Sequence, residues 1–272
     1  MLEIAGLRKV YTGRRGSFEA IADLALTVAP GEFISVVGPS GAGKTTLLRC
    51  IAGLMPITAG TLKLEGRQVD GPPADMAVVL QEYGRSLFPW MTVAQNVELP
   101  LKEKKVPKAL RRQKVEEAIE AVGLAGSADK HPWELSGGMQ QRVAIARAVA
   151  YEPKLLMMDE PFAAVDAQTR AELEDLVLRL WRQLGFTVLF VTHDIDESVY
   201  LSQRVVVLTT SPTQVLDDIP IELTGPRSQL KTRATPEFAA LRTRVYETVQ
   251  AAKMGARSLP YDGPLTATVP VV

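Results

Sequence analysis

The residues with the clearest chemical signature form a glycine-rich loop between an apolar run and a helix-like segment. The loop fits the pattern G-x-x-x-x-G-K-[ST] at every fixed position and consists of Gly38, Pro39, Ser40, Gly41, Ala42, Gly43, Lys44 and Thr45, with Thr46 next. Small residues let backbone N–H groups surround phosphate oxygens, and a helix N-terminus adds positive potential. We expect Lys44 to reach the β and γ phosphates, the Thr45 hydroxyl to ligate Mg²⁺, and Thr46 to line the same site. The loop therefore predicts binding of a nucleoside triphosphate.

Two adjacent acids, Asp159 and Glu160, end the apolar run 155–158. Open α/β sheets place ligands at the carboxyl ends of their strands, so these acids are expected near the phosphates. Asp159 would belong to the Mg²⁺ shell, and Glu160 would polarise an attacking water. The alternative is an ordinary acidic turn before Pro161, and the phosphate loop favours the chemical interpretation.

A histidine follows another apolar run at the same predicted edge. His193 comes directly after residues 188–192 and could donate a hydrogen bond to a γ-phosphate oxygen. Taken alone, it would be interpreted as a satisfied residue in a polar loop. The other histidine, His131, precedes Pro132 without an evident partner, and we predict a structural role for it.

A second segment also places a hydroxyl and glycines before a helix. Ser136, Gly137, Gly138 and Met139 open the apolar-periodic stretch that ends at residue 150. Such a helix N-terminus suits a phosphate, although an ordinary serine N-cap would look the same. Because the segment has no lysine of its own, it would suit the capping of a γ-phosphate that is bound elsewhere.

The composition limits the class of protein. The 272 residues are 46% hydrophobic, with 31 Lys plus Arg and 31 Asp plus Glu, so no overall positive field would attract nucleic acid. The single cysteine, Cys50, is incompatible with a disulfide framework and suits the core of a cytosolic protein. No apolar window is long enough to cross a bilayer, and residues 1–10 lack the apolar segment of a signal peptide.

Apolar strand-like runs alternate with helical patterns and predict an α/β fold. The strands are expected at 33–37, 77–80, 155–158, 188–192 and 205–208. Helices are expected at 45–52, 168–183 and 196–202. Near the N-terminus, 2–10 and 20–28 resemble antiparallel strands around the turn 13–16.

We predict three regions. Residues 1–81 and 152–216 would form the nucleotide-binding α/β core, and 82–151, where helix follows helix, an inserted helical subdomain. Residues 217–272 would be a C-terminal extension with a helix at 236–252 and a partly disordered tail.

Together these motifs resemble those of the ATPases of ATP-binding cassette (ABC) transporters. Residues 38–45 are similar to the family's Walker A motif, Gln81 to its Q-loop glutamine, 135–139 to its signature and 155–160 to its Walker B motif. His193 is similar to the switch histidine. The resemblance implies ATP and Mg²⁺ as cofactors, Glu160, His193 and Gln81 as catalytic residues, and Gln81 as a further metal ligand that couples the nucleotide site to a membrane subunit.

Two further residues fit the family less closely. Tyr11 stands where the family carries an aromatic ring that stacks on adenine, which needs a flat ring. Asp166 fits the D-loop aspartate, although Ala163-Ala164-Val165-Asp166 departs from the usual Ser-Ala-Leu-Asp. A strand-end tyrosine without ligand contact is the alternative for Tyr11.

The resemblance implies an α/β P-loop NTPase core of the RecA-like type, with an N-terminal antiparallel β subdomain and an inserted α-helical subdomain. Two cassettes would pack head to tail, either two copies of this chain or one copy with a paralogue. The signature residues, Ser136 to Met139, would then cap the ATP held by the other cassette.

Residues 71–75 and 81–93, with Asn96-Val97, are similar to the branch of nitrate, sulfonate, taurine and bicarbonate importers. This implies a transmembrane permease, an extracytoplasmic solute-binding protein and a peripheral place on the cytoplasmic face of the membrane. We expect four exposed residues to anchor the permease, namely Leu87, Phe88, Pro89 and Trp90. The alternative is that they close the core of the helical subdomain.

Three other functions stay open at this point. The chain could be a soluble, non-transport ABC ATPase, a module that binds ATP without turnover, or an importer subunit for a different small solute. The segment from Gln81 to Pro89 is longer than in the commonest members of the branch, so it does not identify the solute.

Overall fold

The computed structural model describes residues 1–13, 16–81, 83–223 and 225–258. The predicted disordered tail falls on 259–272, and the tip of the predicted N-terminal turn on 14–15, so both lie outside the described residues. None of the described helices is long and apolar enough to cross a membrane.

A six-stranded sheet forms the centre of the molecule. Its order is β10 (Val215–Pro220), β9 (Arg204–Leu208), β3 (Phe33–Val37), β8 (Thr187–Val191), β7 (Leu155–Asp159) and β6 (Met76–Val79). All neighbouring strands are parallel except β10, which pairs antiparallel with β9. The five predicted strands are confirmed to within one residue at each end, while β10 was not predicted.

Both faces of this sheet are covered, which explains why its strands are apolar throughout. In β8, Val188 and Phe190 pack into one core cluster, whereas Leu189 and Val191 pack into the other. The first cluster joins the sheet to the helices of 93–150, and the second joins it to the N-terminal strands and α1 (Lys44–Ile51). The α/β prediction is therefore confirmed.

The second sheet has four strands in the order β2 (Gly16–Val28), β1 (Leu2–Gly13), β4 (Ala59–Leu64) and β5 (Arg67–Gln68). The pairing of β1 with β2 is antiparallel, as predicted. Buried and exposed residues largely alternate along β1, so one face of this sheet packs on the core. The short strands β4 and β5 were not predicted.

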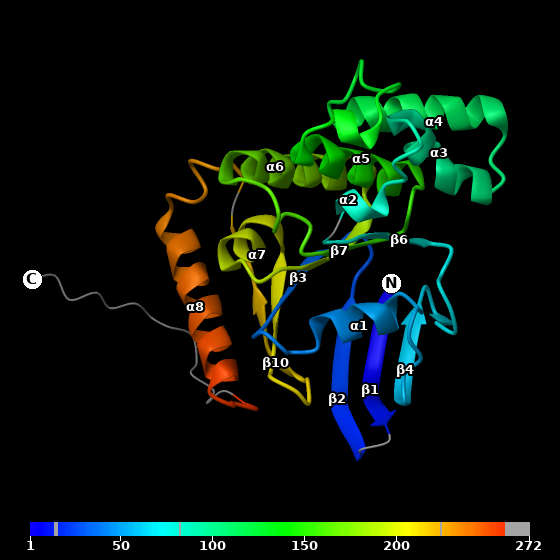
Figure 1. The fold of residues 1–272 in the computed structure, drawn as a ribbon. Coiled ribbons are helices and arrows are strands. Elements are labelled where there is room, and N and C mark those ends of the chain that lie inside the picture. The colour runs from blue at the N-terminus through cyan, green and yellow to red at the C-terminus, as the bar shows by residue number, and fades with distance from the viewer. Residues whose placement is uncertain (14–15, 82, 224, 259–272) are drawn as a thin grey trace, which may run out of the picture.

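Helices fill the region between β6 and β7, where successive helices were predicted. They are α2 (Tyr83–Ser86), α3 (Val93–Glu103), α4 (Lys108–Ala121), the 3-10 helix Pro132–Glu134 and α5 (Gly137–Ala150). Figure 1 shows α3, α4 and α5 together at one end of the molecule, at the top of the view. Thr92 and Gln95 form a capping box that fixes the start of α3.

Three helices flank the other strands: α6 (Ala167–Leu184), α7 (Ile195–Leu201) and α8 (Pro236–Lys253). α8 packs against α7, β9 and β10, so the C-terminal extension lies along the side of the sheet (Figure 1). The helix predicted at 236–252 is thus confirmed, and its position could not be read from the sequence.

Candidate nucleotide site

The glycine-rich loop connects β3 to α1 and has the backbone that its glycines allow. Gly41 has φ 78° and Gly43, the N-cap of α1, has φ 71°, both in the left-handed region. A Cβ on Gly43 would lie 2.6 Å from the Oγ1 of Thr213. The Thr213 hydroxyl also donates to the Ala42 carbonyl at 2.7 Å, so the turn before β10 supports the loop from behind.

Lys44 is held at the centre of this loop. Its Nζ donates to the carbonyl oxygens of Gly38 at 2.9 Å and Pro39 at 3.3 Å. Burial lowers the pKa of Lys44, and the charges of Glu160 and Asp159 oppose that shift. The ammonium is therefore preorganised between backbone oxygens and carboxylates, where a polyphosphate would be attracted.

Asp159 and Glu160 end β7 beside the loop. Burial raises the pKa of Asp159, the charge of Glu160 adds to the rise, and the charge of Lys44 opposes it. Glu160 has φ 44°, a strained value for a residue with a side chain, and its N–H donates to the Val191 carbonyl at 2.8 Å. β7 and β8 together therefore determine where the Glu160 side chain lies.

The residues present fit a magnesium ion. Burial and the charge of the adjacent Glu160 raise the pKa of Asp159, and a divalent cation at Asp159 would offset this effect; Mg²⁺ prefers oxygen ligands with few protein donors. The Asp159 carboxylate and the exposed Thr45 hydroxyl would supply those oxygens. In the described ranges, no group of three or more His, Cys, Asp or Glu side chains could hold a metal ion.

The three residues predicted as catalytic converge on one oxygen atom. The Oε2 of Glu160 lies 2.9 Å from His193 Nδ1 and accepts from Gln81 Nε2 at 3.5 Å. Gln81 follows β6, Glu160 follows β7 and His193 follows β8, so neighbouring parallel strands bring them together. The His193 side chain is 64% exposed, whereas that of Glu160 is 20% exposed. The imidazole therefore faces solvent, where a phosphate could reach it.

A cavity of about 550 Å³ lies over these groups. Gly38, Pro39, Ser40, Lys44, Glu160 and His193 line it on one side. Tyr246, Gln250 and Lys253 of α8 line it on another. Sequence reasoning missed this helical wall, because the helix-like pattern of 236–252 predicts a helix but not its contact with the phosphate loop.

Tyr11 lies beside the start of α1. Its hydroxyl is 3.2 Å from the Oγ1 of Thr46 and 3.1 Å from the Sδ of Met55, and the residue is 38% exposed. The Lys9 ammonium lies 5.3 Å from the centre of the ring. The tyrosine is thus anchored by its hydroxyl, with part of its surface open.

The signature segment does not contribute to this cavity. Among the described residues that line it, none comes from 135–139. Ser136 is instead the N-cap of α5, and its Oγ accepts from Met139 N–H at 3.3 Å. A Cβ on Gly138 would lie 2.5 Å from the Cγ2 of Thr169, so this glycine allows α5 to approach the start of α6.

Asp166 caps α6. Its Oδ1 accepts from Thr169 N–H at 3.0 Å and its Oδ2 from the Thr169 hydroxyl at 2.7 Å. These hydrogen bonds, first the one from the backbone, lower the pKa of Asp166. The aspartate is exposed, so it lies on the surface next to the signature.

The predicted exposure of the permease-anchor residues needs correction for Leu87 and Phe88. Leu87 is not exposed: it is buried to 3% exposure in the helical core, because Asn96 fixes the adjacent backbone through its bonds to Phe88 N–H and C=O. Of the four predicted anchor residues, only Pro89 and Trp90 are exposed, and Phe88 is intermediate.

His131, for which the sequence showed no evident partner, has local partners in the structure. Its ring stacks on Trp133 with centroids 4.4 Å apart, and its Nδ1 lies 3.4 Å from the Oε2 of Glu134. All these contacts are local, which agrees with a structural role.

A strand, a glycine-rich loop with lysine, and a helix, together with acids and a histidine at the ends of neighbouring parallel strands, define a P-loop nucleoside triphosphatase. Within that class, the chain belongs to the ABC transporter family, whose pattern it matches over residues 21–163. The motif residues 38–45, 135–139 and 155–160 all fall in this range.

The chain is also similar to proteins whose names describe the import of nitrate and of aliphatic sulfonates. The chain is 44% identical over 242 residues to the nitrate import ATP-binding protein NrtD of Synechocystis, covering 87% of this chain and 90% of that protein. It is 47% identical over 238 residues to the aliphatic sulfonates import ATP-binding protein SsuB of Bacillus subtilis, covering 87% and 88%.

Solved structures agree on the fold. A dimeric, post-hydrolysis structure of the ATP-binding cassette MJ0796 with ADP and phosphate has a TM-score of 0.72 at 31% identity, covering 82% of this chain and 100% of that one. The cbiO1 subunit of the cbiONQ transporter of Clostridium perfringens has a TM-score of 0.74 at 25% identity, covering 93% and 98%.

Proposed function

We propose that the chain is the ATP-hydrolysing subunit of an ABC importer of the nitrate and sulfonate branch, and that it powers uptake of a small anionic solute through a separate permease. The observation that carries the proposal is the convergence of Gln81 and His193 on the Glu160 carboxylate beside Lys44. The import functions in the names of NrtD and SsuB support the branch.

The site residues take the following roles in this proposal. Tyr11 stacks on adenine, residues 38–46 bind the phosphates, and Lys44 neutralises the β and γ oxygens. The Glu160 carboxylate accepts a hydrogen bond from the attacking water, whose oxygen bonds to the γ-phosphorus as the bond to the bridging oxygen of ADP breaks. His193 donates a hydrogen bond to a γ-phosphate oxygen. Thr45, Asp159 and Gln81 would hold Mg²⁺, which would supply positive charge to offset the charge that develops on the phosphates.

A second cassette completes the site. The exposed Ser136 and Gly137 and the partly exposed Gly138 and Met139 of one copy cap the γ-phosphate in the other, and Asp166 lies at the same interface. The dimer in the similar cassette MJ0796 supports this arrangement. ATP binding then closes the pair, and loss of phosphate and ADP opens it.

The permease contact is proposed at the segment that follows Gln81. Trp90 is 68% exposed, and its ring centroid lies 5.4 Å from that of Phe88, so an aromatic pair stands at the surface. Such a pair is a suitable anchor for an amphipathic helix. The chain would therefore sit at the cytoplasmic face of the membrane, and a solute-binding protein would act through the permease.

Replacing Phe88 and Trp90 together with alanine should abolish coupling. We expect transport by the reconstituted importer to fall at least about tenfold, since anchor residues of this kind contribute on the order of 2 kcal/mol or more. ATP binding by the isolated subunit should stay unchanged. Undiminished transport by the double variant would exclude the docking role.

Phosphate release with and without the reconstituted permease separates the alternatives. An importer subunit should respond to permease and solute-loaded binding protein. A soluble, non-transport ABC ATPase would hydrolyse ATP equally in both conditions, and a binding-only module would release no phosphate in either.

A further inference from the structure

The residues on both sides of His193 are fixed by a buried polar cluster that the proposed chemistry does not use. Thr192 is 2% exposed and Glu197 4% exposed. The Thr192 hydroxyl donates to Glu197 Oε2 at 2.6 Å and accepts from Asp194 N–H at 3.0 Å. One threonine hydroxyl therefore bridges the residue after the histidine to a carboxylate of α7.

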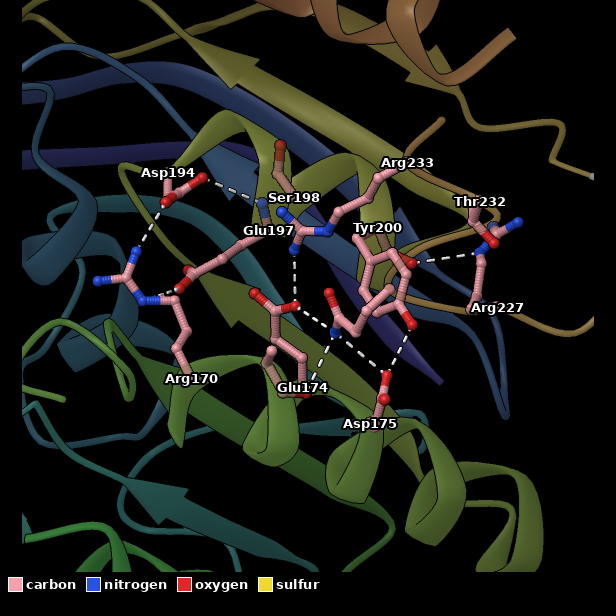
Figure 2. A network of polar contacts seen from close by, with 12 residues as sticks. Arg170, Glu174, Asp175, Asp194, Glu197, Ser198, Tyr200, Arg227, Thr232 and Arg233 are labelled. Carbon is pink, nitrogen blue, oxygen red and sulfur yellow. Dashed lines mark hydrogen bonds and ion pairs between the residues drawn. The ribbon is translucent and has the colours of Figure 1, made fainter. Parts of the chain in front are cut away.

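Asp194 and Arg170 extend this cluster to α6. Asp194 is the N-cap of α7: its Oδ1 accepts from Glu197 N–H at 3.1 Å, and its Oδ2 accepts from Arg170 Nη1 at 3.0 Å. The Arg170 Nε lies 3.5 Å from Glu197 Oε1 (Figure 2). Arg170 is in the first turn of the helix that Asp166 caps, so the histidine loop is joined to the start of α6.

A carboxylate in this position is costly. Burial raises the pKa of Glu197 to about 7; Asp194 and Glu174 push it in the same direction, while the Thr192 hydrogen bond and Arg170 oppose the rise. An apolar side chain would fill the same space without that desolvation. This desolvation cost is explained if the Glu197 carboxylate fixes the conformation of the loop that carries His193.

The C-terminal extension closes the cluster from outside. Glu174, 1% exposed and one turn beyond Arg170, accepts from Arg233 Nη2 at 2.7 Å and from Gln229 Nε2 at 2.8 Å. Arg233 also lies 4.9 Å from the centre of the Tyr200 ring (Figure 2). The segment before α8 is therefore bound to the same pair of helices.

We propose that Thr192, Asp194, Glu197 and Arg170 are positioning residues that hold the His193 imidazole against Glu160 and join it to the start of α6. The inference rests on the proposed role of His193 in hydrolysis. The imidazole is mostly exposed, and its one polar contact among the described residues is with Glu160 at 2.9 Å, so its place depends on the backbone that carries it. A misplacement of about 1 Å can cost on the order of 10²-fold in rate.

The first test removes the bridging hydroxyl with little change of volume. Thr192→Val leaves the Asp194 N–H and the Glu197 carboxylate without their shared partner, and Thr192→Ser restores it. We expect kcat for ATP hydrolysis to fall roughly tenfold in the valine variant, with the Kd for ATP within about twofold of wild type. The serine variant should regain most of the rate.

Tyr200→Phe is the matched control. It removes a part-buried hydrogen bond of the same helix, from the Tyr200 hydroxyl to Asp175 at 2.6 Å, in which no residue of the His193 loop takes part. Its kcat should stay near wild type at a similar loss of thermal stability. If both variants lose the same rate, the cluster acts through general stability and the proposal is wrong.

The second test observes the histidine itself. The chain has only two histidines, so imidazole ¹⁵N signals of the labelled protein are assigned by comparison with His193→Ala. The His193 signals should change in Thr192→Val and not in Thr192→Ser or Tyr200→Phe. Unchanged His193 signals in a folded valine variant would overturn the positioning role.

The two readouts also separate this inference from the proposed function. Wild-type turnover by His193→Ala would refute the hydrolytic role of the histidine. Even with that result, altered His193 signals in Thr192→Val would support the positioning role of the cluster.

Discussion

Two segments of the chain have the same local chemistry and different surroundings. The loop 38–45 and the signature 135–139 both place glycines and a hydroxyl at the start of a helix. Around the loop, the same chain supplies Lys44, Glu160 and His193. Around the signature, Ser136 caps its own helix at the surface, and no residue of 135–139 lines the nucleotide cavity within the described ranges. A helix N-terminus therefore forms a nucleotide site only where other elements converge on it, and in the proposed arrangement the signature would need another copy.

The largest expected effect is on the rate of ATP hydrolysis and concerns the site around the loop 38–45. Glu160→Gln removes the carboxylate on which Gln81 and His193 converge, and keeps its size. General bases contribute about 10² to 10⁴-fold, so we expect kcat to fall roughly 10³-fold with ATP affinity retained. Single-turnover hydrolysis and ATP binding by fluorescence measure the two quantities. Retention of more than a tenth of the wild-type rate would rule out the assigned base.

A smaller effect on hydrolysis is expected from a change in the signature 135–139. Ser136→Ala should lower hydrolysis about tenfold if the hydroxyl caps a phosphate in another copy. Thr92→Ala is the control, because Thr92 caps α3 through the same kind of bond to Gln95 N–H. Each variant should lose about 1 kcal/mol of stability on thermal unfolding. An equal, small effect of both variants on hydrolysis would leave Ser136 as an ordinary N-cap.

The smallest expected effect is on the affinity for ATP and concerns stacking of adenine on Tyr11. Tyr11→Ala should weaken ATP binding about fivefold to tenfold, since base stacking on an aromatic ring contributes about 1–3 kcal/mol, and Tyr11→Phe should retain most of the affinity. Isothermal titration of ATP into Glu160→Gln backgrounds gives the constants. Equal losses in both variants would show that the bond between the Tyr11 hydroxyl and Thr46 matters and the ring does not.

The contrast between the two segments also explains what the sequence could predict. The phosphate loop is a local pattern, and parallel strands must end at one edge, so the amino-acid sequence alone places Lys44, Glu160 and His193 near one another. The apolar runs are also long enough to define five of the six strands of the central sheet.

The missed features depend on long-range contacts. The wall that α8 adds to the cavity depends on bonds such as Arg233 to Glu174, 59 positions apart, which no local pattern encodes. Leu87 is apolar in a run without periodicity, so its burial is decided by the packing around Asn96. The strands β4 and β5 carry mostly exposed residues and lack a strong alternating pattern.

The central claim, that the signature of one copy completes the nucleotide site of another, is tested by cross-linking between differently tagged copies. One copy carries Ser40→Cys and the other Ser136→Cys, both with Glu160→Gln and with the buried Cys50 replaced by alanine. We predict a disulfide between the two tagged copies that forms with ATP and Mg²⁺ and not with ADP. Absence of that disulfide, while both copies bind ATP, would contradict the account.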